Sequence, residues 1–215
     1  EIKNPLTPIQ LTIDRLKTKY SGKLEVNEKE DFAKSLRIIG KQINQIENLV
    51  NEFSDFARMP KPIFKNNNLV IIIKDNINLL KEFDDNIELN FSPLNNNVYF
   101  NSDSEQLSRV IFNLIKNSIE SIQEKKENIL NYKGKIDIEL NKKDTYIELM
   151  IEDNGVGFGI FKDNIKDILN PYFTTKKKGT GLGLAIVNKI INDHQGLLNF
   201  KSLKVGAQIQ IKFNK

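Results

Sequence analysis

Two glycine clusters in the second half of this 215-residue chain could each bring backbone amides close to a ligand. One, Asp153-Asn154-Gly155-Val156-Gly157-Phe158, follows an alternating strand pattern, and the other, Gly179-Thr180-Gly181-Leu182-Gly183-Leu184, opens a helical pattern. Glycine permits close backbone approach, and a helix N-terminus favours negative charge, so the second cluster predicts a phosphate-binding turn. It matches neither the Walker sequence nor the dinucleotide-binding fingerprint. Either cluster alone is equally compatible with a pair of tight turns.

A third polar group lies upstream, in a segment with helical periodicity. Asn113 and Asn117 are four residues apart, so both side-chain amides share one helix face, with Lys116 beside them. Amide oxygens are hard ligands that suit Mg²⁺, an ion that shares phosphate oxygens with its protein ligands. Taken alone, the pattern is better explained as a solvated face in an asparagine-rich protein.

The order of these motifs decides between the interpretations. Pro171-Tyr172-Phe173-Thr174-Thr175-Lys176 lies between the two glycine clusters, and the whole series resembles the N, G1, F and G2 boxes of the GHKL ATPase superfamily. The resemblance is specifically to the catalytic domain of bacterial sensor histidine kinases, and it covers about residues 103–196. It implies ATP and Mg²⁺ as cofactors.

The same resemblance implies a role for each motif. Asn117 would coordinate Mg²⁺, with Asn113 beside it as a second candidate ligand, and Asp153 would accept a hydrogen bond from the adenine amino group. Residues 158–178 would form a mobile ATP lid, in which Lys177 and Lys178 are solvated charges. Gly155 and Gly157 would let the backbone pass close to the base, the amides of Gly181 to Leu184 would hold phosphates, and Lys116 and Lys176 would be nearby cations. The implied ATP-binding residues are Asn113, Lys116, Asn117, Asp153, Gly155, Gly157, Lys176, Gly179, Thr180, Gly181, Leu182, Gly183 and Leu184.

The first residues resemble a further family motif. Glu1-Ile2-Lys3-Asn4-Pro5-Leu6 is similar to the H box, His-Glu-x-x-Asn/Thr-Pro, beginning one residue late. The resemblance implies that Glu1 orients or deprotonates an acceptor histidine directly before it, and that Asn4 aligns water for dephosphorylating the partner. Glu1 is also explained as a first-turn acid that favours the helix dipole. We expect a fragment whose parent carries the histidine, and a chain that as given does not phosphorylate itself at the usual site.

His194 is the only histidine of the chain. It lies at the end of the helix that follows the second glycine cluster, where family members often carry a histidine, so a structural or capping role is predicted. Together with residues 56–62, the H-box segment is similar to NtrY-like nitrogen-regulation sensors.

Two heptad-spaced apolar series predict the elements that precede the motifs. Ile2 to Tyr20 and Phe32 to Phe53 step by three and four, which indicates an antiparallel helical hairpin over residues 1–58. Because two such helices bury little apolar surface, a dimeric four-helix bundle is favoured over a monomeric hairpin packed on the rest of the chain.

Pro60 and Pro62 end the second helix, so a linker is placed at 59–67 and the ATP-binding domain at 68–215. The predicted class is α+β, with the hairpin followed by a GHKL (Bergerat-type) two-layer α/β sandwich. Residues 69–73 form a β-branched run. Helices are expected over residues 74–83, 103–125 and 181–193, and strands over 87–91, 98–101, 136–140, 146–152, 197–202 and 207–213.

Composition excludes several kinds of chemistry. Cysteine is absent, which rules out disulfides, thiol nucleophiles and cysteine-ligated metals, and one histidine makes a zinc site or a Ser-His-Asp triad hard to build. A net charge of +4 with interspersed acids does not indicate nucleic-acid binding. No apolar run reaches the roughly 18 residues that cross a bilayer. The resemblance to sensor histidine kinases implies a cytoplasmic portion, attached to the inner membrane only through upstream segments of the parent.

Three functions remain open from the sequence. The first is a sensor histidine kinase core that transfers the γ-phosphoryl group of ATP to a histidine and then to an aspartate of a response-regulator receiver domain. The second is an ATP-binding signalling scaffold or response-regulator phosphatase without autokinase activity, and the third is a GHKL serine kinase.

Overall fold

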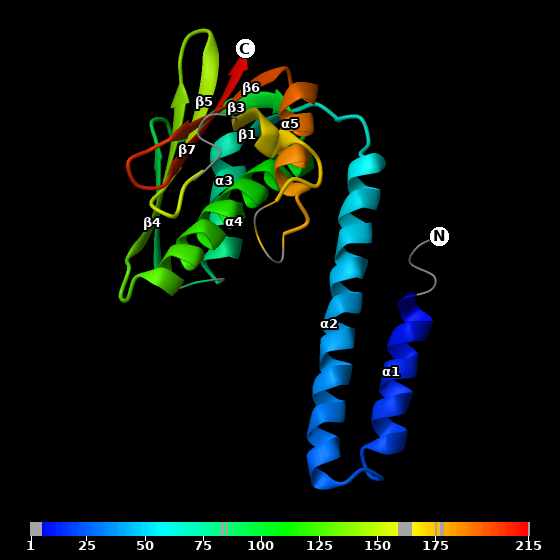
Figure 1. Ribbon diagram of the computed structural model, residues 1–215. Coiled ribbons are helices and arrows are strands. Elements are labelled where there is room, and N and C mark those ends of the chain that lie inside the picture. Colours follow the sequence, from blue (N-terminus) through cyan, green and yellow to red (C-terminus); the bar gives the residue numbers. More distant parts are fainter. Residues whose placement is uncertain are drawn as a thin grey trace. The chain divides into compact units, whose positions relative to one another are not determined.

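The computed structural model describes residues 6–82, 84, 86–158, 165–174, 176 and 179–214. The chain forms two compact units (Figure 1): Glu1–Met59 with Thr175–Thr180, and Pro60–Thr174 with Gly181–Lys215. The segment predicted as a linker, 59–67, therefore belongs to the second unit from Pro60 onward. No helix within the described ranges combines the length and the apolar content that crossing a bilayer requires.

The first unit contains the predicted antiparallel hairpin, which is confirmed. Helix α1 (Leu6–Tyr20) and helix α2 (Val26–Ala57) are joined by a short turn. The Nε2 of Gln10 donates to Oδ1 of Asn44 at 2.8 Å, and the rings of Tyr20 and Phe32 meet edge to face with centroids 6.4 Å apart. These contacts fix the register between the two helices.

The heptad series of α2 divides into two sets within this unit. Leu36 and Ile43 are buried, at 7% and 5% exposure, whereas Ile39 and Ile46 are 46% and 48% exposed. One half of the series therefore packs inside the hairpin, and the other half presents isoleucine side chains at its surface.

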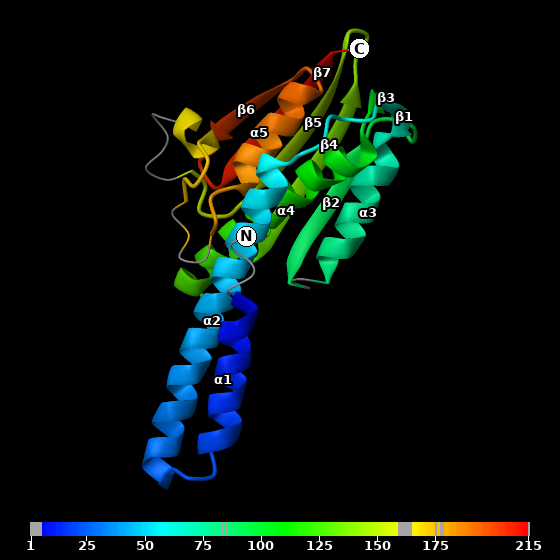
Figure 2. The same cartoon turned by 90° about the vertical axis from the view of Figure 1, so that its right-hand side faces the viewer.

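A five-stranded sheet forms the centre of the second unit, with strand order β2-β4-β5-β7-β6. β2 runs parallel to β4, and the other neighbours are antiparallel. Helices α3, α4 and α5 cover one face of the sheet (Figure 2). The strands are β2 (Ile87–Pro93), β4 (Gly134–Lys142), β5 (Tyr146–Asp153), β6 (Gly196–Ser202) and β7 (Ala207–Asn214), and the helices are α3 (Leu69–Lys81), α4 (Ser104–Asn128) and α5 (Gly183–Asp193). A 3-10 helix, η2 (Ile165–Leu169), precedes α5.

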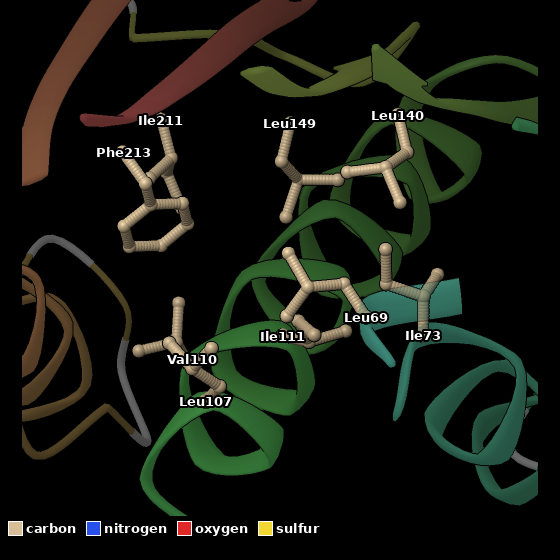
Figure 3. Close-up of a pocket in the computed structure, with 9 residues that line it drawn as sticks. All are labelled: Leu69, Ile73, Leu107, Val110, Ile111, Leu140, Leu149, Ile211 and Phe213. Atoms are coloured by element: carbon tan, nitrogen blue, oxygen red, sulfur yellow. The ribbon is translucent and has the colours of Figure 1, made fainter. Parts of the chain in front are cut away.

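The core lies between this sheet and the helices. Burial alternates along β5, where Ile147, Leu149 and Ile151 point inward, as expected for a sheet with one covered face. A cavity of about 10 Å³ remains among nine hydrocarbon side chains from α3, α4, β4, β5 and β7 (Figure 3). Its lining contains no polar group that could recognise a ligand, so it is a packing gap of the core.

Two local expectations are corrected by the structure. The helix expected over 74–83 begins earlier, at Leu69, so the β-branched run 69–73 is the first part of α3; Leu69, Val70 and Ile73 all lie on its buried face. Asn68 caps this helix, with Oδ1 accepting the amide of Val70 at 3.1 Å. The asparagine run before it forms strand β1 (Lys65–Asn68), antiparallel to β3 (Tyr99–Ser102), instead of a linker.

Candidate functional site

One face of α4 carries four polar residues at intervals of four. Asn113, Asn117, Ser121 and Lys125 follow one another on successive turns, so they form a single stripe along the helix. Lys116 lies beside this stripe, with its ammonium 3.9 Å from the carboxylate of Glu120. The sequence reasoning identified the first two members of the stripe and missed the last two.

The first member of the stripe lies against the start of α5. The Nδ2 of Asn113 donates to the carbonyl of Arg109 at 2.8 Å. A Cβ added to Gly183 would come within 3.3 Å of Oδ1 of Asn113, a tighter approach than most Cβ atoms make, so the Asn113 side chain would have to shift slightly. The N-box helix and the second glycine cluster are therefore in direct contact. The amides in the first turn of α5 have no carbonyl partner within the helix and could receive an anion.

The Pro171-Tyr172-Phe173 segment is folded onto the second glycine cluster. The amide of Tyr172 donates to the carbonyl of Gly181 at 3.1 Å. Gly181 has φ +71°, and a Cβ there would approach the carbonyl carbon of Tyr172 to 2.4 Å, so only glycine fits. Leu182, the next residue, is fully buried and precedes α5 as its N-cap.

At the end of β5, the first glycine cluster carries a buried carboxyl group. Asp153 is 8% exposed, and its Oδ1 accepts the amide of Gly155 at 2.9 Å. Burial raises the pKa of Asp153, while hydrogen bonds from Gly155, Ser118 and Ala207 and the charge of Lys125 lower it without outweighing burial. The carboxyl group is held in place as an acceptor.

The glycines of this cluster are required by packing. A Cβ on Gly155 would lie 2.2 Å from Oγ of Ser121, and one on Gly157, where φ is +71°, would lie 2.6 Å from the carbonyl oxygen of Gly206. The loop is thus wedged between α4 and the turn that joins β6 to β7. This requirement is separate from the close approach to a base that the resemblance implies.

Three residues that the sequence analysis missed bind the backbone of this loop. The amide of Val156 donates to Oγ of Ser121 at 3.0 Å. The ammonium of Lys125 donates to the carbonyls of Asn154 and Gly155 at 2.8 and 2.9 Å. The hydroxyl of Tyr132 donates to the carbonyl of Asn154 at 2.5 Å. Continuing the four-residue spacing beyond Asn117 would have identified Ser121 and Lys125.

His194 is structural, as predicted. It is 4% exposed and caps the C-terminus of α5. Its Nδ1 donates to the carbonyl of Ile190 at 2.8 Å, and its Nε2 accepts the amide of Asp103 at 3.0 Å. Both bonds are made together by the neutral ring with its proton on Nδ1.

The remaining predicted residues belong to the first unit or lie outside the described part. Lys176, Gly179 and Thr180 belong to the first unit, where the amide of Gly179 donates to the carbonyl of Lys176 at 3.1 Å and the hydroxyl of Thr180 donates to the carboxylate of Glu52. No cluster of three or more His, Cys, Asp or Glu side chains that could hold a metal occurs among the residues that the structure describes. Outside the described ranges lie Glu1, Asn4, Lys177 and Lys178.

Two family models match this chain. Residues 102–215 match the family described as histidine kinase-, DNA gyrase B- and HSP90-like ATPase. Residues 1–62 match the His Kinase A (phospho-acceptor) domain.

Curated relatives match along the whole chain. The NtrY-like protein of Rickettsia prowazekii (strain Madrid E) is 40% identical over 215 residues, which are 100% of this chain and 34% of the relative. The nitrogen regulation protein NtrY of Azorhizobium caulinodans is 36% identical over 212 residues, which are 99% of this chain and 27% of the relative. The chain thus spans about a third of the length of these relatives or less.

Solved structures match the fold. The catalytic domain of histidine kinase ThkA superposes with a TM-score of 0.62 and 28% identity, covering 71% of this chain and 96% of that one. Histidine kinase ThkA in complex with the response regulator protein TrrA superposes with a TM-score of 0.69 and 24% identity, covering 100% of this chain and 59% of that one.

Proposed function

This chain belongs to the family of histidine kinase-, DNA gyrase B- and HSP90-like ATPases, and on that premise we propose that it binds Mg-ATP as the catalytic core of a sensor histidine kinase. The match of residues 1–62 to the phospho-acceptor domain favours a histidine kinase over the other branches of the family. Similarity to NtrY-type proteins along the whole chain favours the same branch.

One observation carries the proposal: the polar face of α4 joins the two glycine clusters. Asn113 contacts the start of α5 at Gly183, and Ser121 contacts the loop that follows Asp153. The carboxyl group of Asp153, which suits an adenine amino group, and the amides at the start of α5, which suit phosphates, are thereby both held against α4. This arrangement favours a nucleotide that lies along α4.

Each residue of this site has a proposed task. Asp153 accepts the adenine amino group, and the amides of Gly181 to Leu184 surround the phosphates. Asn117, with Asn113 beside it, offers amide oxygens to Mg²⁺. Lys116 and Lys176 add positive charge, and Gly179 and Thr180 of the second glycine cluster contribute to ATP binding. Bound Mg-ATP supplies the γ-phosphoryl group, and the chain contributes positioning and charge neutralisation.

The hairpin supplies the acceptor side of the reaction. An acceptor histidine directly before Glu1 receives the phosphoryl group, with Glu1 orienting or deprotonating its ring. The group then passes to an aspartate on a response-regulator receiver domain, and Asn4 aligns water for the later hydrolysis of that aspartyl phosphate, which releases inorganic phosphate. Ile39 and Ile46, exposed on α2, favour pairing with a second hairpin into a four-helix bundle. Upstream segments of the parent attach it to the inner membrane.

Calorimetric titration with ATP, with and without Mg²⁺, tests nucleotide binding. Asn117→Ala should abolish binding or its Mg²⁺ dependence. Asn128→Ala is the matched control, because Asn128 is another α4 asparagine, and its side chain donates to the carbonyl of Glu124 on the same helix at 3.0 Å. A folded wild-type chain that does not bind ATP would refute the proposal.

The type of phosphoryl transfer is tested in the parent protein that includes the preceding histidine. Incubation with labelled ATP should yield a phosphate that acid releases and base does not, which is the behaviour of phosphohistidine. Acid-stable, base-labile phosphate would indicate a serine kinase instead. Binding of ATP with no phosphorylation would indicate a scaffold or a response-regulator phosphatase.

A further inference from the structure

The loop after Asp153 is held from its carbonyl side by α4. Lys125 places its ammonium between the carbonyls of Asn154 and Gly155, at 2.8 and 2.9 Å. These are charge-assisted hydrogen bonds, which are stronger than bonds between neutral groups. The same ammonium lies 4.7 Å from the ring centre of Tyr132, whose hydroxyl also binds the carbonyl of Asn154. Two side chains thus converge on one peptide carbonyl, directly after the buried carboxyl group.

The side chain of Asn154 fastens the loop at a second point. Its Oδ1 accepts the amide of Lys135 at 2.8 Å, and its Nδ2 donates to the carbonyl of Lys133 at 2.9 Å. Asn154 is therefore fixed at its backbone by Lys125 and Tyr132 and at its side chain by the start of β4. The bonds from Lys125 to the carbonyls of Asn154 and Gly155 restrain this loop on the helix side, together with the bond from the Val156 amide to Ser121.

The orientation of Asp153 depends on this restraint. Its Oδ1 accepts the amide of Gly155, the residue whose carbonyl Lys125 binds. The amide of Gly155 forms one peptide unit with the carbonyl of Asn154, which Lys125 also binds. A shift of this unit would move the Gly155 amide and the carboxylate bonded to it. Lys125 is thus coupled to the carboxylate through one residue, and its positive charge also favours the ionised form of that carboxyl group.

We propose that Lys125 is a positioning residue for base recognition, which aims the carboxylate of Asp153 at the exocyclic amino group of adenine and so sets the preference for adenine nucleotides. This inference rests on the proposed function. It assigns Lys125 no contact with the phosphates, because within the described residues its ammonium donates its hydrogen bonds to the carbonyls of Asn154 and Gly155 in the G1-box loop. Its loss is therefore expected to weaken recognition of the base and to leave phosphate binding intact.

Replacing the adenine amino group tests the proposal. Inosine triphosphate carries an oxygen at that position and keeps the triphosphate, so the ratio of the ATP to the ITP affinity isolates the bond to Asp153. Lys125→Met should weaken ATP binding on the order of tenfold, the loss expected for a charge-assisted bond, and change ITP binding less than about twofold. Lys125→Arg should restore much of the ratio. Adding Lys125→Met to Asp153→Asn should cause little further loss, because Lys125 acts through the interaction that Asp153→Asn has already removed.

Lys126→Met is the matched control. Lys126 is the next residue of α4, and its ammonium pairs with Asp84 at 3.1 Å, away from the loop, so the ratio should not change. Tyr132→Phe provides a milder second variant that removes one bond to Asn154 and should lower the ratio slightly. Thermal unfolding confirms that each variant is folded.

The possible results separate the two proposals. If the wild-type chain binds ATP and both Lys125→Met and Tyr132→Phe keep its ATP-to-ITP affinity ratio, the positioning role of Lys125 is overturned, while the proposed function stands. Equal losses for ATP and ITP also overturn it, because they indicate a merely structural lysine. A folded wild-type chain that binds neither nucleotide refutes the proposed function and this inference with it.

Discussion

The imidazole of His194 accepts the backbone amide of Asp103 at 3.0 Å, across 91 positions of sequence. Asp103 is the N-cap of α4, and His194 is the C-cap of α5, so one buried ring joins the ends of two helices. The ring of Phe64 meets it edge to face at 5.1 Å, which brings the segment before β1 to the same point. Three parts of the second unit therefore depend on a single side chain.

Removing this ring should destabilise the protein. His194→Ala leaves the amide of Asp103 buried without its acceptor and opens a cavity, so we expect a loss of about 2–4 kcal/mol in the free energy of unfolding. Urea denaturation measures this change in the free energy of unfolding. Asp193→Ala is the control: Asp193 forms a partly exposed pair with Lys189 at 3.4 Å, so its substitution should cost less than about 0.5 kcal/mol. A His194→Ala loss no larger than the control would contradict the structural role.

The carboxylate of Asp103 should make stability depend on pH. Burial raises the pKa of Asp103, but amide hydrogen bonds from Ile63, Gln106 and Glu105 outweigh it and leave the pKa below 3.8. An acid with a lowered folded pKa contributes its full stability above 3.8 and loses it as the pH falls through the folded value. Asp103→Ala should cost about 1 kcal/mol at neutral pH. In denaturation series, this difference from wild type should shrink steadily below pH 3.8; a constant difference would contradict it.

Local signals were sufficient for most helices and strands of the second unit. Asp103 marks the start of α4 because its side chain caps two amides, and that interaction is local. The run 69–73 carries conflicting signals, because β-branched residues favour strands, whereas the burial of Leu69, Val70 and Ile73 follows helical spacing. Tertiary packing of this buried face determines that the run is helical. The pairing of β1 with β3 and the parallel pairing of β2 with β4 join distant segments, which leave no local signature.

The site was predictable as a set of motifs and not as a set of contacts. Spacing alone placed Asn113 and Asn117 on one face. A Cβ would collide with Ser121 if it were added to Gly155, and with Gly206 if it were added to Gly157. Both neighbours are distant in the sequence, so the sequence does not reveal why these positions require glycine. The role of Lys125 is hidden for the same reason, since its acceptors are main-chain carbonyls that any sequence possesses.

Gly206 should tolerate no side chain. Its φ is +82°, and a Cβ would lie 1.8 Å from the carbonyl oxygen of Asp153. Gly206→Ala should therefore destabilise the protein by more than about 2 kcal/mol and weaken ATP binding by displacing Asp153. Gly22→Ala, where a Cβ meets nothing within 4 Å, is the control and should be nearly neutral. Denaturation measures the stability of the two variants, and calorimetry measures their ATP binding. A Gly206→Ala protein as stable as the control would contradict the close packing of Gly206 against Asp153.

The exposed isoleucines of α2 should hold two copies together. Ile46 belongs to the heptad series and is 48% exposed, so Ile46→Glu should convert a dimer to a monomer in sedimentation experiments. Ile38 is 54% exposed but lies outside that series, so Ile38→Glu should leave the dimer intact. If the Ile46→Glu protein remained dimeric, pairing through this face would be wrong.

Binding of ATP should depend on the protonation of Asp153. The groups around this carboxyl are Ser118 and Lys125 on α4 and the amides of Gly155 and Ala207. Burial raises its pKa above 3.8, so protonation occurs at a higher pH than for an exposed aspartate. The ionised carboxylate is the stronger acceptor for an amino group, and ATP affinity should fall as the pH drops through the folded pKa.

Comparison with ITP removes the titration of the phosphates from this measurement. Both nucleotides carry the same phosphates, so protonation of phosphate lowers both affinities alike and cancels in their ratio. The ratio should fall toward acid pH in wild type. In Lys125→Met the fall should begin at a higher pH, because the positive charge that lowers the pKa of Asp153 is gone. A ratio that is flat with pH would show that ionisation of Asp153 plays no part in recognising the base.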